Sequence, residues 1–299
     1  MLERIQRPGV TPKMRTNGKY RRVVWFLVLV SGAIPCETAD ALTRASHRQD
    51  RSASTALTPL QLEIEKQRTR LSSADVEERR DAVTRLHSMH RAEASRAALE
   101  GLRDPEAIVR ASAAAAILSL PADESAANLI PLLNDKDEFV RRETAYALGK
   151  TRNRTAVSPL IERLLNDKLD SVRGAAAVAL GEIGDETAVS SLAAVLNPQL
   201  ALPSKRSKKS KKPENPFVLR AAARSLGQIR SRAGLPALIA VLNDEQAEND
   251  VRRESAFALG AVGDSSALPA LRQAVSHADP YLSQAAHEAI RKILRSNSQ

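Results

Sequence analysis

Apolar and polar positions repeat along most of this chain with the period of an α-helix. A ten-residue phrase recurs as VRRETAYALG (140–149), VRGAAAVALG (172–181) and VRRESAFALG (251–260). Apolar or small residues fall at its first position and at +4, +7 and +8, so they share one helical face. The pattern therefore predicts a recurring buried helix. Weaker copies in the same register occupy residues 78–87, 109–118, 218–227 and 282–291.

Another apolar helix is predicted before each copy, as in AVSPLIERLLND (156–167) and LPALIAVLND (235–244). The copies start 31 to 33 residues apart, except for one interval of 46 residues that places an insertion loop at 197–216. A fixed period of this length is typical of solenoids, in which each unit packs only on its neighbours. We therefore expect an all-α fold, an α-α superhelix of about seven helix pairs over residues 59–299.

Small residues dominate the buried face of the phrase. Ala, Ser or Thr stands at +4, +5 and +7 in most copies, and Gly149, Gly181, Gly227 and Gly260 stand at +9. Small side chains let neighbouring helices approach closely. With the preceding aspartate included, the consensus reads Asp-x4-Val-Arg-x3-Ala-x-Ala-Leu-Gly, and Ile-Gly-Asp follows it.

This consensus resembles the HEAT-like repeat that is also found in phycobilin lyases, and the resemblance covers roughly residues 70–299. It implies a HEAT-repeat solenoid in which the second helix of each pair lines the concave face. Repeats of this type serve many unrelated partners, so the resemblance indicates the fold and says little about function.

The N-terminal segment has the order of an export signal. A basic stretch is followed by the apolar run 23–34 and by Ala39-Asp40-Ala41. Twelve apolar residues are too few to cross a ~30 Å hydrocarbon core comfortably. We expect residues 1–41 to be a signal peptide and the polar residues 42–58 to be a disordered linker. The protein is then periplasmic or secreted, and an uncleaved signal that anchors it to a membrane stays an alternative.

The net charge of +10 has two local sources. Of the 45 Lys/Arg and 35 Asp/Glu residues, seven and three lie in 1–41, and six Lys/Arg lie in 205–212, which leaves 32 of each sign elsewhere. The repeats are therefore neutral, and the insertion carries a candidate anion-binding loop. No aromatic residue interleaves this cluster, which disfavours specific nucleic-acid recognition. The candidate residues are Lys205, Arg206, Lys208, Lys209, Lys211 and Lys212.

An arginine occupies position +1 in five copies, and an aspartate precedes the phrase by five residues in three of them. An anion-binding stripe is one interpretation. The favoured one is an Asp-Arg ladder that ties successive turns together, which predicts that Arg141→Ala lowers stability more than partner affinity. The arginines are Arg79, Arg110, Arg141, Arg173 and Arg252, and the aspartates are Asp104, Asp135 and Asp167.

Arg142-Glu143 and Arg253-Glu254, at +2 and +3, turn away from the buried face and are the candidate partner-binding residues. Deoxyhypusine hydroxylase, an iron enzyme with similar repeats, carries His-Glu in such places. Arg replaces His in both units here, and a guanidinium cannot ligate iron. We therefore expect no metal, no cofactor and no catalytic residue, and hence that the chain is not an enzyme.

The predicted function is a non-catalytic protein-binding scaffold or adaptor, exported to the cell envelope, that binds a protein or peptide on its concave helical face. One alternative is an electrostatic tether, in which residues 205–212 hold the solenoid to an anionic lipid, polysaccharide or nucleic acid. The other is a HEAT-type enzyme similar to a phycobilin lyase or an iron hydroxylase. The export signal and the scarcity of aromatic residues disfavour a pigment-handling role.

Overall fold

The computed structural model describes residues 57–200 and 214–296, which form helices and turns without a β-strand. The predicted signal peptide (1–41), most of the predicted linker (42–58) and the Lys/Arg cluster at 205–212 lie outside the described residues. Within the described ranges, no helix is long and apolar enough to cross a membrane.

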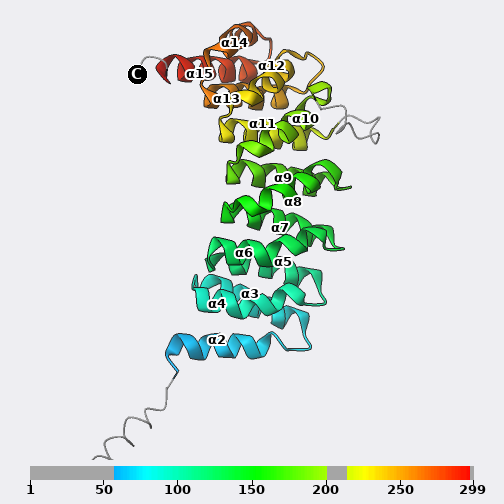
Figure 1. The fold of residues 1–299 in the computed structure, drawn as a ribbon, viewed down its shortest axis with the longest axis vertical. Helices are drawn as coiled ribbons and strands as arrows, with labels where there is room; N and C mark the ends of the chain where they lie inside the picture. Colours follow the sequence, from blue (N-terminus) through cyan, green and yellow to red (C-terminus); the bar gives the residue numbers. More distant parts are fainter. Residues whose placement is uncertain (1–56, 201–213, 297–299) are drawn as a thin grey trace, which may run out of the picture. The chain divides into compact units, whose positions relative to one another are not determined.

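The described helices form a stack of seven antiparallel pairs, which confirms the predicted all-α solenoid (Figure 1). The first helices are α2 (Pro59–Arg70), α4 (Ala92–Ala98) with its 3₁₀ extension η1 (Leu99–Arg103), α6 (Ala122–Leu129) with η3 (Ile130–Asn134), α8 (Val157–Asn166), α10 (Val189–Leu196), α12 (Leu235–Asn243) and α14 (Leu268–Val275). The second helices are α3 (Val76–Ser88), α5 (Ala107–Ala116) with η2 (Ile117–Ser119), α7 (Glu138–Thr151), α9 (Asp170–Ile183), α11 (Pro216–Ile229), α13 (Asn249–Val262) and α15 (Pro280–Ser296).

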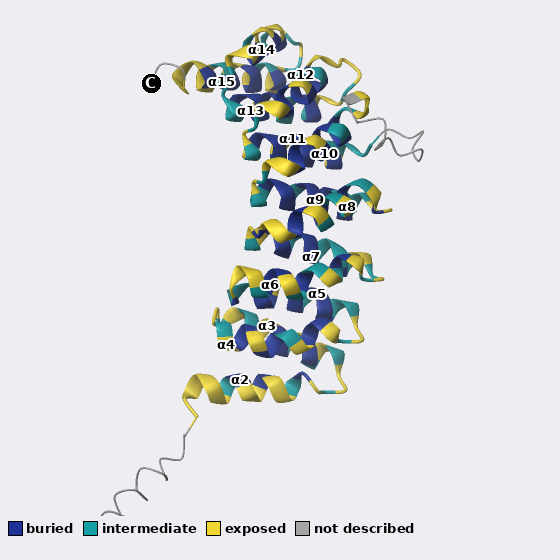
Figure 2. Ribbon diagram, in the orientation of Figure 1, coloured by how far each residue is buried: buried dark blue, intermediate teal, exposed yellow. Residues whose placement is uncertain are grey.

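A leucine and alanine core runs through the whole stack (Figure 2). Within each pair, leucines of the first helix such as Leu160 and Leu238 are fully buried against the small residues of the second helix. Successive second helices share many more contacts than successive first helices do. Because closer spacing on one side curves a stack towards that side, the second helices line its inner surface.

Turns between units follow a local rule that the sequence shows. Gly184 and Gly263 end α9 and α13 in the left-handed conformation, with φ of 74° and 80°, which glycine adopts without a Cβ clash. Asp185 and Asp264 follow, and each carboxylate accepts a backbone N–H two residues on. This pair of signals closes one unit and starts the next.

The glycines at +9 face a neighbouring second helix at close range. A Cβ added to Gly149 would lie 2.8 Å from Ala179 Cα, and one added to Gly227 would lie 2.8 Å from Ala258 Cα. At Gly260 the corresponding distance to Ala289 Cα is 2.7 Å. These positions have no room for a side chain, so the repeated glycine sets the spacing of the inner surface.

Candidate functional site

In five of the seven units, an arginine at +1 joins the unit to the next one. Arg110 donates from Nε and Nη2 to both carboxylate oxygens of Asp135, at 2.8 and 2.9 Å, and Arg141 binds Asp167 in the same way at 2.8 and 3.1 Å. Arg79 repeats the geometry with Asp104. The third nitrogen of each guanidinium donates to backbone carbonyls of its own loop. The Asp-Arg ladder is therefore present, and every rung crosses between two units.

Two rungs use other residues. Arg173 donates to Asp170 of its own helix and, at 2.6 Å, to Glu214, which follows the insertion. Arg252 Nη1 lies 3.0 Å from His277 Nε2, and His277 occupies the place of the aspartate. The arginine is kept in five units while its partner changes, so these arginines stabilise the stack and are not free to bind an anion.

The ladder carboxylates ionise more readily than ordinary aspartates. Burial raises the pKa of Asp167, but hydrogen bonds from Arg141 and from the Leu169 N–H outweigh it and hold the pKa below its usual value. Burial is opposed in the same way at Asp104 and Asp135, whose pKa values are also lowered. Each carboxylate therefore stabilises the folded state above the pKa it has when unfolded.

We expect the stack to lose stability below about pH 4, the ordinary aspartate pKa. A lowered folded-state pKa contributes stability that is complete above the unfolded pKa and is lost as pH falls through the folded pKa. The check is the midpoint of thermal unfolding followed by circular dichroism from pH 7 to pH 3. The double variant Arg141→Met, Asp167→Leu lacks one rung and should show a shallower decline; an equal decline would contradict the assignment.

His277→Asp should raise stability by about 1 kcal/mol. The Asp279 N–H donates to His277 Nδ1 while Arg252 Nη1 faces Nε2, and a neutral imidazole has one acceptor nitrogen for these two donors. A carboxylate accepts both, as Asp135 does from Arg110 and Asp137. Urea unfolding measures the change. His277→Asn supplies one acceptor and should give no gain, and an aspartate variant no more stable than wild type would refute this reading.

Aromatic side chains lie on the second helices alone throughout the described ranges. None of them is buried, and Phe217, Phe257 and Tyr281 are 41%, 38% and 67% exposed. They stand at position −1 or +6 of the phrase, away from the buried positions 0, +4, +7 and +8, and Tyr146 also packs partly against the core. We call this surface the aromatic face. It consists of Phe139 on α7, Tyr146 on α7, Phe217 on α11, Phe257 on α13 and Tyr281 on α15.

The four predicted partner-binding residues all lie on the second helices, in two different settings. Arg142 binds Glu143 at 3.0 Å and stacks 4.9 Å from the Phe139 ring centre, so this pair sits at the aromatic face of α7. Arg253 stacks 5.6 Å from the Tyr281 ring centre and lines a hollow with Phe257. Each arginine thus holds an aromatic ring in place by a cation–π contact.

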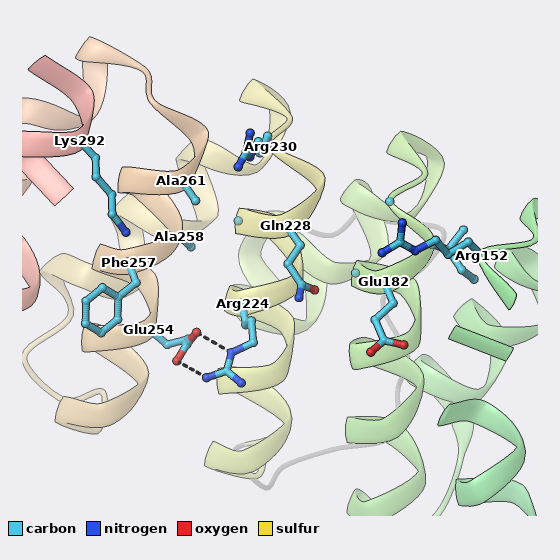
Figure 3. A pocket seen from close by; sticks show the side chains of 14 residues that line it. Arg152, Glu182, Arg224, Gln228, Arg230, Glu254, Phe257, Ala258, Ala261 and Lys292 are labelled. Carbon is cyan, nitrogen blue, oxygen red and sulfur yellow. Dashed lines mark hydrogen bonds and ion pairs between the residues drawn. The ribbon is translucent and has the colours of Figure 1, made fainter. Parts of the chain in front are cut away.

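Glu254 has a different role from Arg253. Its carboxylate accepts two hydrogen bonds from Arg224 of the preceding unit, at 2.8 and 3.2 Å, as the dashed lines in Figure 3 show. This ion pair belongs to the wall of a groove that Arg142 and Glu143 do not line. The four residues therefore lie on the second helices, as the register predicts, whereas the groove depends on how the units stack.

The groove runs across the C-terminal ends of the second helices from the end of α7 to α15 and encloses about 810 Å³. Gly181, Gly227, Ala258 and Ala261 form its floor, because the residues that bring the helices together leave no side chains above them. The walls are polar. They carry Arg152, Glu182, Arg224, Gln228, Arg230, Glu254 and Lys292, with Phe257 at one end (Figure 3).

The described residues contain no group of three or more His, Cys, Asp or Glu side chains placed to hold a metal ion. His87 and His90 lie near each other at the end of α3, with ring centres 5.6 Å apart.

A stack of helix pairs in which each unit packs on its neighbours places the protein in the class of α-solenoids. Models of HEAT repeats match residues 64–149, 95–178, 126–200 and 246–298, and the PBS lyase HEAT-like repeat matches residues 218–244. These matches cover more than half of the chain, so the protein belongs to the HEAT repeat family.

Among relatives, deoxyhypusine hydroxylase of Gallus gallus is 54% identical over 48 residues, which are 16% of this chain and 16% of that enzyme. The structure of human deoxyhypusine hydroxylase covers 78% of this chain and 84% of its own, with 20% identity and a TM-score of 0.39. The CpcE–CpcF complex of phycocyanin lyase from Nostoc sp. PCC7120 covers 81% and 93%, with 21% identity and a TM-score of 0.47. A designed armadillo repeat protein in complex with the peptide (KR)4 covers 77% and 99%, with 20% identity and a TM-score of 0.47.

The prediction that the chain is not an enzyme is contradicted, because the sequence relative deoxyhypusine hydroxylase is an enzyme. The sequence argument rested on Arg142 and Arg253 in place of histidine. Two positions cannot decide the chemistry of an array that offers equivalent positions in seven units. An export signal, for its part, gives a location and does not test for activity.

Proposed function

We propose that this protein binds a polypeptide segment along its inner surface of second helices. The observation that carries the proposal is the aromatic face: every aromatic side chain of the described residues is partly exposed on the second helices. Aromatic and arginine side chains are enriched at the anchoring points of protein interfaces, where they contribute most of the binding energy.

Two further features support a polypeptide as the ligand. Arg142 and Arg253 stack on Phe139 and Tyr281, so these side chains lose little freedom when a partner covers them. The groove beside Phe257 is open and crosses several units, which suits an extended chain better than a small molecule that must be largely enclosed. The cell-envelope location predicted from residues 1–41 remains part of this proposal.

The test is selection from a random peptide library displayed on phage, with the full chain as bait. Peptides that bind wild type with micromolar affinity should bind the variant Phe257→Ser, Tyr281→Ser at least about tenfold more weakly, because its anchors are gone. Leu62→Ser removes an apolar side chain that is 56% exposed on α2, away from the second helices, and should change nothing. Selection of no peptide, or equal binding by the double variant, would refute the proposal.

A further inference from the structure

The groove holds three cations that no group in the described chain neutralises. The side chains of Arg152, Arg230 and Lys292 line it and make no hydrogen bond or ion pair with any described residue. The other charges on the walls are already matched, since Glu254 binds Arg224 and Glu182 accepts from Lys150 at 2.6 Å. The groove therefore presents three unpaired positive charges beside a floor of glycine and alanine.

Two of these cations stand where the backbone disfavours them. Arg152 and Arg230 end α7 and α11 with φ of 52° and 58°, the left-handed conformation that Gly184 and Gly263 adopt at the same point of other units. A side chain in this conformation strains the backbone, and such strain collects at functional sites. A cation does favour a helix C-terminus, but Lys150 already supplies one in the last turn of α7.

We propose that this groove binds an acidic, extended polypeptide segment, with carboxylates of the segment paired to Arg152, Arg230 and Lys292. The proposal rests on the proposed function and names its ligand. Gln228 lies over the floor without a partner in the described chain, and its amide offers both a donor and an acceptor to a peptide backbone. Phe257 at the edge of the groove packs against an apolar side chain of the segment.

The dimensions and charges favour a peptide over a nucleic acid. Five successive second helices at about 8–10 Å spacing span roughly 30–40 Å, which an extended chain of about ten residues covers. The carboxylates of Glu182 on α9 and Glu254 on α13 are paired, but in helix order they lie between the free cations. A phosphate backbone carries a charge at every nucleotide and must pass both carboxylates. A peptide can place its acidic residues beside the free cations and its apolar residues elsewhere.

Fluorescence anisotropy with labelled probes tests the proposal on the full chain. The probes are a ten-residue peptide of alternating Glu and Leu, the same peptide with Lys for Glu, and a ten-nucleotide single-stranded DNA. The acidic peptide should bind at least about tenfold more tightly than the other two, and its affinity should fall as salt rises. Equal or tighter binding of the lysine peptide or the DNA, or no binding of the acidic peptide, would overturn the proposal.

The variant Arg152→Gly, Arg230→Gly should weaken the acidic peptide about tenfold. Gly184 and Gly263 occupy the same helix-end position in other units, so the variant should melt no lower than wild type. A loss of binding is then not a loss of folding. Lys168→Gln, Arg272→Gln removes two exposed cations away from the groove and should leave affinity unchanged. An equal loss in both variants would mean a general charge effect and would overturn the proposal.

The peptide library separates this inference from the proposed function. If Phe257→Ser, Tyr281→Ser abolishes binding of library peptides that show no acidic preference, the proposed function stands and this inference fails.

Discussion

Arg141→Ala is expected to lower the free energy of unfolding by about 3 kcal/mol. Asp167 is the most buried carboxylate of the ladder, with 2% of its side chain exposed, and it accepts both of its arginine hydrogen bonds from Arg141. Arg163 stays nearby at 3.6 Å and offsets a part of the loss. Removing Arg141 leaves a buried, poorly compensated charge, and it also leaves two backbone carbonyls without their donor.

Equilibrium urea unfolding measures this loss, and the position of the rung predicts the shape of the curve. The rung joins the third unit to the fourth, and solenoid units stabilise one another only through their neighbours. The transition should therefore broaden as the two halves uncouple. Arg154→Ala is the matched control, because Arg154 is 83% exposed in its pair with Asp185 and should contribute at most about 0.5 kcal/mol. Equal effects of the two substitutions would contradict the structural role of the ladder.

The repeat register made the fold and much of the ladder predictable from the sequence. A phrase that recurs with a fixed period places equivalent residues at equivalent points of each unit, so the arginines and aspartates of the ladder could be named by position. That Arg110 binds Asp135 of the next unit depends on how the units stack. The rung of Arg173 could not be predicted, since Glu214 lies 41 residues further on, beyond the insertion. The partner of Arg252 could have been found, because His277 stands at the register position of the aspartates, although histidine does not suggest an arginine partner.

The candidate site was only partly visible in the sequence. Register placed Arg253 and Glu254 on an outward face, and the same reasoning applied to Phe217, Phe257 and Tyr281 would have revealed the aromatic face. The groove depends on distances between units, which periodicity does not supply. The left-handed conformation of Arg152 and Arg230 could have been found, because both stand at +12 of the phrase, where Gly184 and Gly263 end their helices, but their residue type does not suggest it.

The inner surface combines two properties that usually conflict, close packing and an accessible groove. Glycine and alanine at +7 to +10 bring second helices together, and the absence of side chains there leaves the hollow whose walls carry the charges. A larger residue on the floor would therefore push the helices apart and fill the groove in a single step. Stability and the proposed binding therefore depend on the same small residues.

Gly227→Ala should lower the free energy of unfolding by about 1–3 kcal/mol, although alanine is the better helix former by nearly 1 kcal/mol. The added Cβ would lie 2.8 Å from Ala258 Cα and 2.9 Å from Ala258 Cβ, against ordinary contacts of 3.4–4 Å. The atom it meets is backbone of α13, which cannot swing away as a flexible side chain could, so α11 and α13 must separate. The steric cost therefore exceeds the gain in helix propensity, so a glycine-to-alanine change that usually stabilises a helix destabilises this one.

Thermal and urea unfolding of three variants separate these terms. Adding Ala258→Gly to Gly227→Ala removes the contact with Ala258 Cβ but keeps the one with its Cα, so the pair should recover only part of the loss. In Gly184→Ala the new Cβ has nothing within 4 Å, but the residue has a φ of 74°. Its expected loss of about 1 kcal/mol therefore comes from backbone strain alone. If Gly227→Ala is as stable as wild type, neighbouring second helices can shift freely, and the glycines do not set the spacing of the groove.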